Sequence, residues 1–326
     1  MIEIRFPFTD IDNVTLKRYL LENGFELKFS TIQKLYYSVI RPIIPIQVRL
    51  RLQKNVSKEI SWKRDFIDDQ LVNIVHQSPK SKVTIQNLYP PGFDSAIILT
   101  HDVETTEGLR YIPKILEMER RYNLCSSWNI VPYKYKIDEG IIRLIRESGH
   151  EIGIHGYNHD GKLYYSEKIF RERASYINKA LKKYGAVGFR SPMVHRNLLW
   201  LQQLDIEYDA SCFDYDPFQP IPGGTGSIWP FIAGKFVELP YTIPQDHTLF
   251  YILNKKDISI WQKKADWVVS NRGVVLTLTH PDYLMKKNHL HLYEQFLQYL
   301  AQIQDTWHCL PKEMAAWWMK KHCPLP

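Results

Sequence analysis

Two acidic side chains follow directly after an apolar run in the first third of the chain. Residues 96–104 read AIILTHDVE, so Asp102 and Glu104 stand two positions apart where the run ends. In an extended strand, side chains two apart point to the same face. One carboxylate of such a pair can bind a cation while the other accepts a proton from water. Glu107 lies three residues further on, in the first turn of a predicted helix, where an acid stabilises the helix dipole.

Two histidines spaced by four residues supply further groups of the kind that bind metals. His155 and His159 lie in HGYNHD, after the apolar run EIGI. Imidazoles at this spacing can reach one ion from a helical turn or a tight loop, and a carboxylate from another strand end would be the third ligand. The alternative is that an HxxxH pair arises by chance. We predict a divalent-metal site, with zinc as its ion.

These residues need a fold that brings the ends of strands together. From residue 94 onward, short apolar runs alternate with helical patterns such as 167–184, which indicates βαβ units. We predict an α/β fold, a distorted (β/α) barrel of about seven strand–helix units, in which chemistry collects where the strands end. The predicted strands lie in 96–100, 126–131, 151–155, 186–190, 206–210, 236–242 and 273–280.

The first 90 residues differ from the rest of the chain in charge. They carry 14 Lys and Arg against 9 Asp and Glu, and within 34–64 eight basic residues accompany one acid. We predict a basic N-terminal accessory region over 1–90, as a small extension of a barrel over 91–326. Basic and apolar residues interleave in 34–64, which is compatible with peripheral membrane association through anionic lipid head groups, or with a solvated helix face. No signature of a nucleic-acid reader is present.

Composition and the start of the chain bear on location. Hydrophobic residues make up 44% and aromatic residues 13% of the sequence, which indicates a folded protein. The start, MIEIRFPFTD, carries charges where a signal peptide needs an apolar run, and no stretch approaches the roughly 18 apolar residues of a membrane span. We expect a cytoplasmic protein, at the inner membrane face if residues 34–64 bind lipid.

Five motifs follow one another along the chain. They are Asp102-Val103-Glu104, His155 with His159, Arg190-Ser191-Pro192, the acids from Asp209 to Asp214, and Leu278-Thr279-His280. This ordered set resembles the polysaccharide deacetylase family, the NodB homology domain of carbohydrate esterase family four. The resemblance covers roughly residues 94–284 and implies a metal-dependent hydrolase that removes N-acetyl groups from sugars. The family's first motif has two adjacent aspartates, which this chain opens to D-V-E.

The resemblance implies a role for each residue of the first two motifs. His155 and His159 would be metal ligands, Asp102 the catalytic base and Glu104 the third ligand. The exchange of roles between the two acids is the alternative. His101, where the family usually has an aromatic or apolar residue, is expected to be a packed, hydrogen-bonded imidazole.

The later motifs would handle proton transfer and sugar binding. Arg190 would hold the Asp102 carboxylate through a charge-assisted hydrogen bond. His280 would donate a proton to the departing amine, oriented by Asp209 or Asp214. The tryptophan that usually lines the family's groove is missing from the fourth motif. Aromatic residues on the following loop are expected either to stack on sugar rings or to pack in the loop; they are Tyr215, Phe218 and Trp229.

The sequence therefore predicts an enzyme that deacetylates a sugar or polysaccharide precursor. Two other functions remain open at this point. One is hydrolysis of a small cyclic amide by the same metal site, and the other is noncatalytic carbohydrate binding. Asp246 and His247, which follow the strand predicted in 236–242, are expected to be structural or to line the rim of the pocket.

Overall fold

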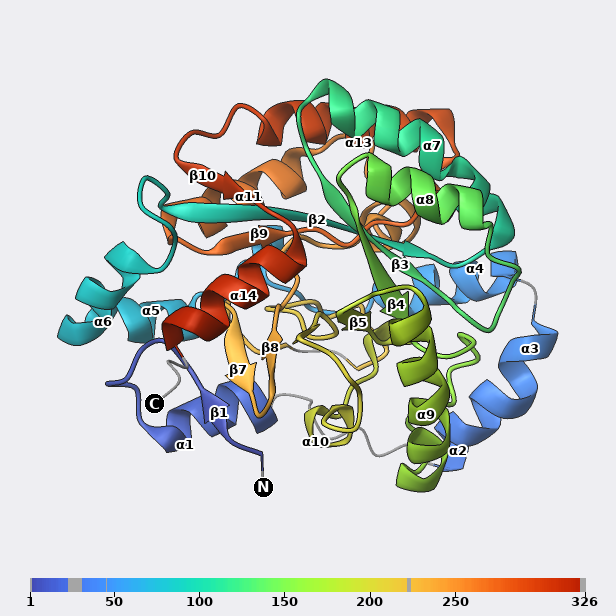
Figure 1. Ribbon diagram of the computed structural model, residues 1–326, viewed down its shortest axis with the longest axis horizontal. Coiled ribbons are helices and arrows are strands. Elements are labelled where there is room, and N and C mark those ends of the chain that lie inside the picture. The colour runs from blue at the N-terminus through green and yellow to red at the C-terminus, as the bar shows by residue number, and fades with distance from the viewer. Residues whose placement is uncertain (1, 23–30, 45, 222–223, 323–326) are drawn as a thin grey trace.

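The computed structural model describes residues 2–22, 31–44, 46–221 and 224–322 (Figure 1). Its centre is a sheet in which seven strands run parallel, in the order β9-β2-β3-β4-β5-β6-β8. Each of the seven predicted ranges contains or overlaps one of these strands. They are β2 (Ser95–Val103), β3 (Ser126–Ile130), β4 (Glu151–His155), β5 (Gly188–Arg190), β6 (Tyr208–Asp209), β8 (Phe236–Glu238) and β9 (Val274–Leu276).

The chain after β8 closes this sheet into a barrel. The amide nitrogens of Thr242 and Ile243 each lie 3.1 Å from the carbonyl oxygen of Leu276, in β9. Parallel pairing of β9 with β2 completes the circuit. The predicted distorted (β/α) barrel is therefore confirmed, and the carboxyl ends of its parallel strands share one rim.

Three further strands lie outside the predicted set. β7 (Phe231–Ala233) pairs antiparallel with β8, and β1 (Ile4–Arg5) pairs antiparallel with β7. β10 (Thr306–His308) pairs in parallel with the first three residues of β2. The N-terminal segment thus adds a strand to the barrel sheet. Its buried Phe6 and Phe8 pack edge to face against Trp229. The boundary at residue 90 stays a prediction.

Helices cover the outside of the barrel (Figure 1). α9 shows how the sequence sets their ends: the Ser166 hydroxyl accepts the amide of Ile169, and Gly185 follows the helix at a φ of +49°. No helix of the described residues is long and apolar enough to cross a membrane. The helices after β2 are α7 (Thr106–Arg121), α8 (Glu139–Glu147), α9 (Glu167–Lys183), η5 (Pro192–Val194), α10 (Leu198–Leu201), η6 (His247–Ile252), α11 (Ser259–Ser270), α12 (Pro281–Leu284), α13 (Lys287–Leu300) and α14 (Pro311–His322).

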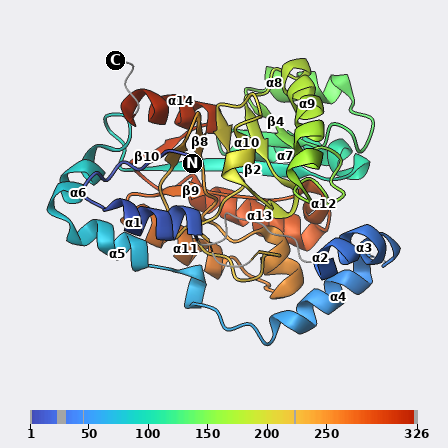
Figure 2. The same cartoon turned by 90° about the horizontal axis from the view of Figure 1, so that it is seen from below.

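The helices before β2 form two groups on opposite sides of the molecule. Figure 2 shows α1, α5 and α6 together on one side, and α2, α3 and α4 together on the other. α4 contacts η6 of the barrel region. The bounds are α1 (Asn13–Leu16), η1 (Lys17–Glu22), α2 (Thr31–Leu35), η2 (Tyr36–Ile40), α3 (Arg41–Ile43), α4 (Ile46–Ser57), η3 (Arg64–Phe66), α5 (Gln70–Gln77), α6 (Pro79–Thr84) and η4 (Ile85–Asn87).

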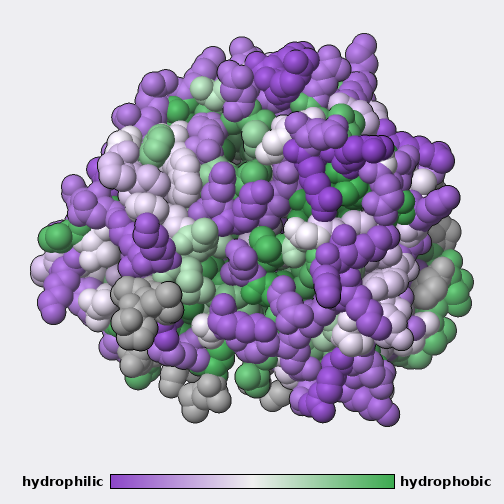
Figure 3. Space-filling model, viewed as in Figure 1, coloured by the Kyte–Doolittle hydropathy of each residue, from purple (hydrophilic) through white to green (hydrophobic). Residues whose placement is uncertain are grey.

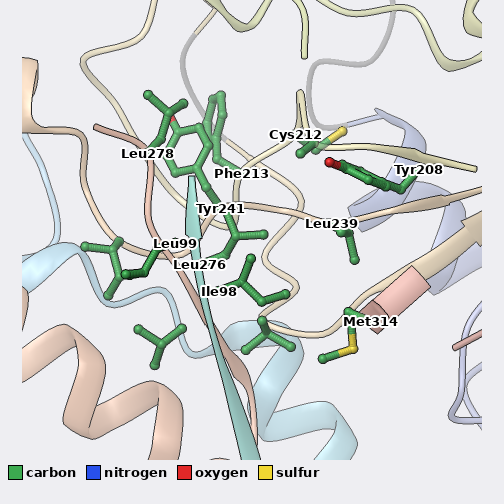
Figure 4. Close-up of a cluster of buried hydrophobic side chains, with 14 of the residues drawn as sticks. Ile98, Leu99, Tyr208, Cys212, Phe213, Leu239, Tyr241, Leu276, Leu278 and Met314 are labelled. Carbon is green, nitrogen blue, oxygen red and sulfur yellow. The ribbon is translucent and has the colours of Figure 1, made fainter. Parts of the chain in front are cut away.

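The barrel interior is filled by apolar side chains from several strands. Figure 4 shows Ile98 of β2 and Leu276 of β9 in one cluster with Leu239, Tyr241 and Met314. All five side chains are at most 1% exposed. Met314 comes from α14, which contacts β6 and β8. Full burial of each such side chain stabilises the fold by about 1.5–3 kcal/mol, so this cluster fixes the strands that carry the polar rim.

One buried acid lies at the start of β4, at the opposite end from that rim. Glu151 is 4% exposed, and its two carboxyl oxygens accept hydrogen bonds from the Tyr208 hydroxyl (2.9 Å) and the Lys312 amide (3.2 Å). Burial raises the pKa of Glu151 from 4.5 to about 7. Between these values the native chain holds a proton that the unfolded chain releases, so stability falls as the pH rises.

We expect Glu151→Gln to remove this pH dependence. The glutamine amide can donate to the Tyr208 oxygen while its carbonyl accepts the Lys312 N–H, so the contacts of a protonated acid are kept. Between about pH 4.5 and pH 8 the wild type should lose about 3 kcal/mol more unfolding free energy than the variant. Urea denaturation across this range measures the difference. Parallel stability curves for the two proteins would contradict the assignment.

Candidate metal and catalytic site

A cavity of about 860 Å³ opens at the carboxyl rim of the barrel. This is within the size range of small-molecule sites. Its wall combines polar residues from the strand ends with residues of α2–α4. The strand-end residues that line it are Asp102, Glu104, His155, His159 and His280.

Three of these residues form a group that fits a cation. Ligand atoms of Glu104, His155 and His159 all lie within 4.8 Å of one another. Nε2 of His159 is buried without a hydrogen bond of good geometry, although it lies 3.0 Å from Oε1 of Glu104. Two imidazoles and one carboxylate are a donor set that suits zinc and related divalent ions, and they leave positions open for water or substrate. A buried imidazole nitrogen that has no hydrogen bond and faces a carboxylate therefore fits a metal ligand.

The surroundings of His155 prepare it for metal binding. Its Nδ1 lies 3.0 Å from the carbonyl oxygen of Arg190, and because a carbonyl only accepts, Nδ1 carries the proton. Nε2 is then the free acceptor that faces the cavity. Burial lowers the pKa of His155 to about 4, so the ring is neutral at neutral pH. The carboxylate of Glu104 is ionised as well: burial opposes this, but the contact with His159 and the positive charges of His280 and Lys134 hold its pKa well below 4.5.

Asp102 is held in one orientation by two donors. Its Oδ1 accepts hydrogen bonds from Asn129 Nδ2 (2.8 Å) and Arg190 Nη1 (3.3 Å), and its Oδ2 lies 3.6 Å from His155 Nε2. Burial raises the pKa of Asp102, but nearby cations, among them Arg190 and His280, and the hydrogen bond from Asn129 outweigh this and lower it. Arg190 is itself anchored, since Nε donates to the Ala210 carbonyl at 2.7 Å. The predicted Arg190–Asp102 contact is present.

His280 reaches the same cavity from the chain that follows β9, the strand that pairs with β2. Its Nε2 lies 3.9 Å from Oε1 of Glu104, while Nδ1 and the backbone N–H both contact Asp246, each at 2.7 Å. Burial lowers the pKa of His280, but the Asp246 carboxylate more than offsets this and raises it to about 9. The imidazole is therefore protonated at neutral pH, with one N–H available toward the cavity.

The prediction that Asp209 or Asp214 orients His280 is wrong. Asp209 is fully buried, and its Oδ1 accepts a hydrogen bond from the Ser211 hydroxyl at 2.7 Å. Asp214 forms a buried ion pair with Lys264. Neither acid lines the cavity, so neither is placed to contact a substrate there.

Of the three aromatic residues expected to stack on a sugar or to pack in the loop, one lines the cavity and two do not. Trp229 is fully buried and donates from Nε1 to the Arg272 carbonyl at 2.9 Å, so the prediction that it stacks on a sugar is wrong. The Tyr215 hydroxyl accepts the amide of Lys63 at 3.1 Å, and Tyr215 does not line the cavity. Phe218, on the same loop, does line it.

Sequence reasoning missed other parts of the site. Asn129 is the last residue but one of β3, and its amide donates to Asp102. A polar residue near the end of a predicted strand was a signal that could have revealed it. Asp282 accepts the backbone N–H of Glu104 at 3.0 Å and fixes the end of β2. The wall from α2–α4, which includes Arg41 and Leu52, had no motif to reveal it.

Comparisons with known proteins find similarity to deacetylases. A curated peptidoglycan deacetylase from Helicobacter pylori is 23% identical over 227 residues, which are 58% of this chain and 77% of that protein. A solved structure assigned as a polysaccharide deacetylase from Mycobacterium smegmatis has a TM-score of 0.55 at 18% identity, covering 70% of this chain and 91% of the other. No family model matches the chain.

Two further solved structures share the fold. One, assigned as a polysaccharide deacetylase from Pseudomonas aeruginosa PAO1, has a TM-score of 0.55 at 15% identity and covers 73% of this chain and 95% of the other. The other is an allantoinase with a TM-score of 0.53 at 14% identity, covering 73% and 94%. At these sequence identities, the similarity to the solved structures supports the barrel fold alone.

Proposed function

Because this chain has the polysaccharide deacetylase fold and resembles that family in its motifs, we propose that it is a metal-dependent hydrolase that removes N-acetyl groups from a sugar or polysaccharide precursor. One observation supports the proposal above all: a candidate cation site, the buried carboxylate of Asp102 and the protonated His280 all line the same cavity. The curated relative is a peptidoglycan deacetylase, which supports an acetylated sugar as the substrate class.

Glu104, His155 and His159 would hold the cation, which we propose to be zinc. A divalent cation supplies Lewis-acid polarisation of the acetamide oxygen and of a water molecule. Nδ1–H of His155, fixed on the Arg190 carbonyl, keeps Nε2 turned toward the cavity. The hydrogen bond that the backbone N–H of Glu104 donates to the Asp282 carboxylate holds this backbone, so that the Glu104 carboxylate faces His159.

Asp102 would accept the proton that water loses as the water oxygen bonds to the acetyl carbon. Its lowered pKa keeps the carboxylate ionised, and the hydrogen bonds from Asn129 and Arg190 on Oδ1 leave Oδ2 for the proton. The alternative, in which Asp102 binds the metal and Glu104 is the base, is less well supported, since Glu104 belongs to the ligand group with the two histidines.

His280 would give its Nε2 proton to the sugar nitrogen as the C–N bond breaks. Amide hydrolysis needs this step because an amine anion is a poor leaving group. The Asp246 carboxylate on Nδ1 keeps the ring charged and oriented. The products are acetate and a free amino sugar, and Asp102 and His280 return to their starting states by proton exchange with water.

Acetate release from a panel of substrates tests the proposal. We expect release from at least one N-acetylated sugar, such as chitooligosaccharides or a nucleotide-linked N-acetylhexosamine, with loss of activity on chelation and recovery on adding zinc. Small cyclic amides in the same panel test the alternative hydrolase. Ring opening of a cyclic amide without acetate from any sugar would overturn the proposed substrate class. Sugar binding by metal-free protein that releases no acetate would support a noncatalytic protein instead.

A further inference from the structure

Helices α2–α4 expose an unusual concentration of large aliphatic side chains. Fourteen large hydrophobic residues are exposed among the described residues, and six of them lie within 35–52. Folded monomers usually scatter such residues singly, and a larger patch marks an interaction site. The six are Leu35 (54% exposed), Val39 (49%), Ile40 (40%), Ile43 (75%), Val48 (46%) and Leu52 (51%).

These helices have two different faces. Leu35, Val39 and Ile43 recur every fourth residue along the continuous helical segment 31–43, which places them in one outward stripe. Tyr37 points the other way: it is 8% exposed, and its hydroxyl lies 3.2 Å from His195 Nε2. The segment is thus anchored by its inner face, and packing on the barrel does not account for its outer stripe. Figure 3 shows hydrophobic surface at the right-hand edge, where Figure 1 places α3.

The charge of residues 31–58, which contain α2–α4, is complementary to an anionic partner. Residues 31–58 contain six Lys and Arg and no Asp or Glu. Lys34, Arg51 and Lys58 are exposed on these helices or directly after them, and the acid next in the sequence is the exposed Glu59. A surface that combines exposed aliphatic side chains with an excess of cations suits the boundary between lipid head groups and acyl chains.

We propose that α2–α4 seat this protein on an anionic lipid bilayer. The aliphatic stripe enters the acyl boundary, and the basic residues contact the head groups. The inner face of the same helices lines the cavity through Tyr37 and Arg41, so the cavity lies beside the bilayer surface. The proposal concerns binding alone and does not depend on the proposed hydrolysis.

Vesicle flotation of the full chain tests this surface. We expect the protein to float with vesicles that contain about one-third phosphatidylglycerol and not with pure phosphatidylcholine, and to be released as salt rises from about 0.1 M to 0.5 M. The double variant Val39→Ser/Ile43→Ser should bind about tenfold or more weakly. The triple variant Lys34→Gln/Arg51→Gln/Lys58→Gln should lose about 100-fold on anionic vesicles.

Matched controls separate this surface from exposed residues elsewhere. The double variant Val83→Ser/Leu199→Ser removes two aliphatic side chains outside α2–α4 that are 68% and 56% exposed. This variant should float with the vesicles like the wild type. Circular dichroism and thermal unfolding verify that the variants fold. Equal binding by the Val39→Ser/Ile43→Ser variant, or a wild type that does not float, overturns the proposal. Sedimentation tests whether the stripe instead binds a second copy of the chain. A wild-type dimer that dissociates in the Val39→Ser/Ile43→Ser variant, together with no vesicle binding, would assign the stripe to that contact.

Discussion

Replacing His155 by alanine is expected to strip the divalent metal from the protein and to abolish acetate release. Nε2 of His155 is one of three ligand atoms within 4.8 Å of one another. Even changes to groups that only support a ligand weaken metal binding by about 10–100-fold, so loss of the ligand itself should exceed about 100-fold. The metal-to-protein ratio after dialysis against a competing chelator, measured by plasma mass spectrometry, gives the result independently of any substrate.

The control for this variant is His247→Ala. His247 lines the same cavity and is half-buried, but it lies outside the ligand group. It should keep the wild-type metal content, whatever happens to substrate binding. A His155→Ala protein that retains its metal would show that the cation, if one binds, lies elsewhere.

Asp102→Asn is expected to lower turnover by about 10²–10⁴-fold while leaving the metal in place. The asparagine oxygen can still accept the hydrogen bonds of Asn129 and Arg190, so the change removes the proton acceptor with little rearrangement. The turnover number on the best substrate of the panel and the metal content of the same preparation are measured together. Turnover within tenfold of the wild type would exclude Asp102 as the base.

Two matched variants sharpen this second prediction. Glu104→Gln should weaken metal binding, so opposite metal contents in Glu104→Gln and Asp102→Asn separate ligand from base. If Asp102→Asn loses the metal and Glu104→Gln keeps it, the two roles are exchanged. Asp160→Asn changes another carboxyl on the cavity wall, one that pairs with Arg173 at 2.7 Å. Its turnover should stay within a few fold of the wild type.

The barrel could be predicted because its signals are local. Each parallel strand is a short apolar run buried on both faces, and each helix has its own three- and four-residue periodicity. The strands that escaped prediction depend on distant partners instead. Ile4–Arg5 is a strand only because it pairs with β7, more than 220 residues away. Pairing of that kind leaves no periodic pattern in a two-residue segment.

The candidate site was partly readable for a related reason. Parallel strands of a barrel deliver their carboxyl ends to one rim, so polar residues at those ends converge whatever the loops do. This is why Asp102, His155, Arg190 and His280 could be grouped from their positions in the sequence. The wall formed by 36–60 could not be placed, because its docking depends on side-chain packing between segments that share no local pattern.

The sequence by itself determined the residue types at the strand ends and, through them, the metal-and-carboxylate chemistry that we propose for the cavity. Only the tertiary structure decided the partners. His280 pairs with Asp246 and not with Asp209 or Asp214, because the turn into η6 brings that carboxylate to 2.7 Å. Trp229 packs against Phe6 and Phe8 of the N-terminal segment, away from the cavity. Such choices depend on distances of a few ångströms between distant loops, which spacing along a chain does not encode.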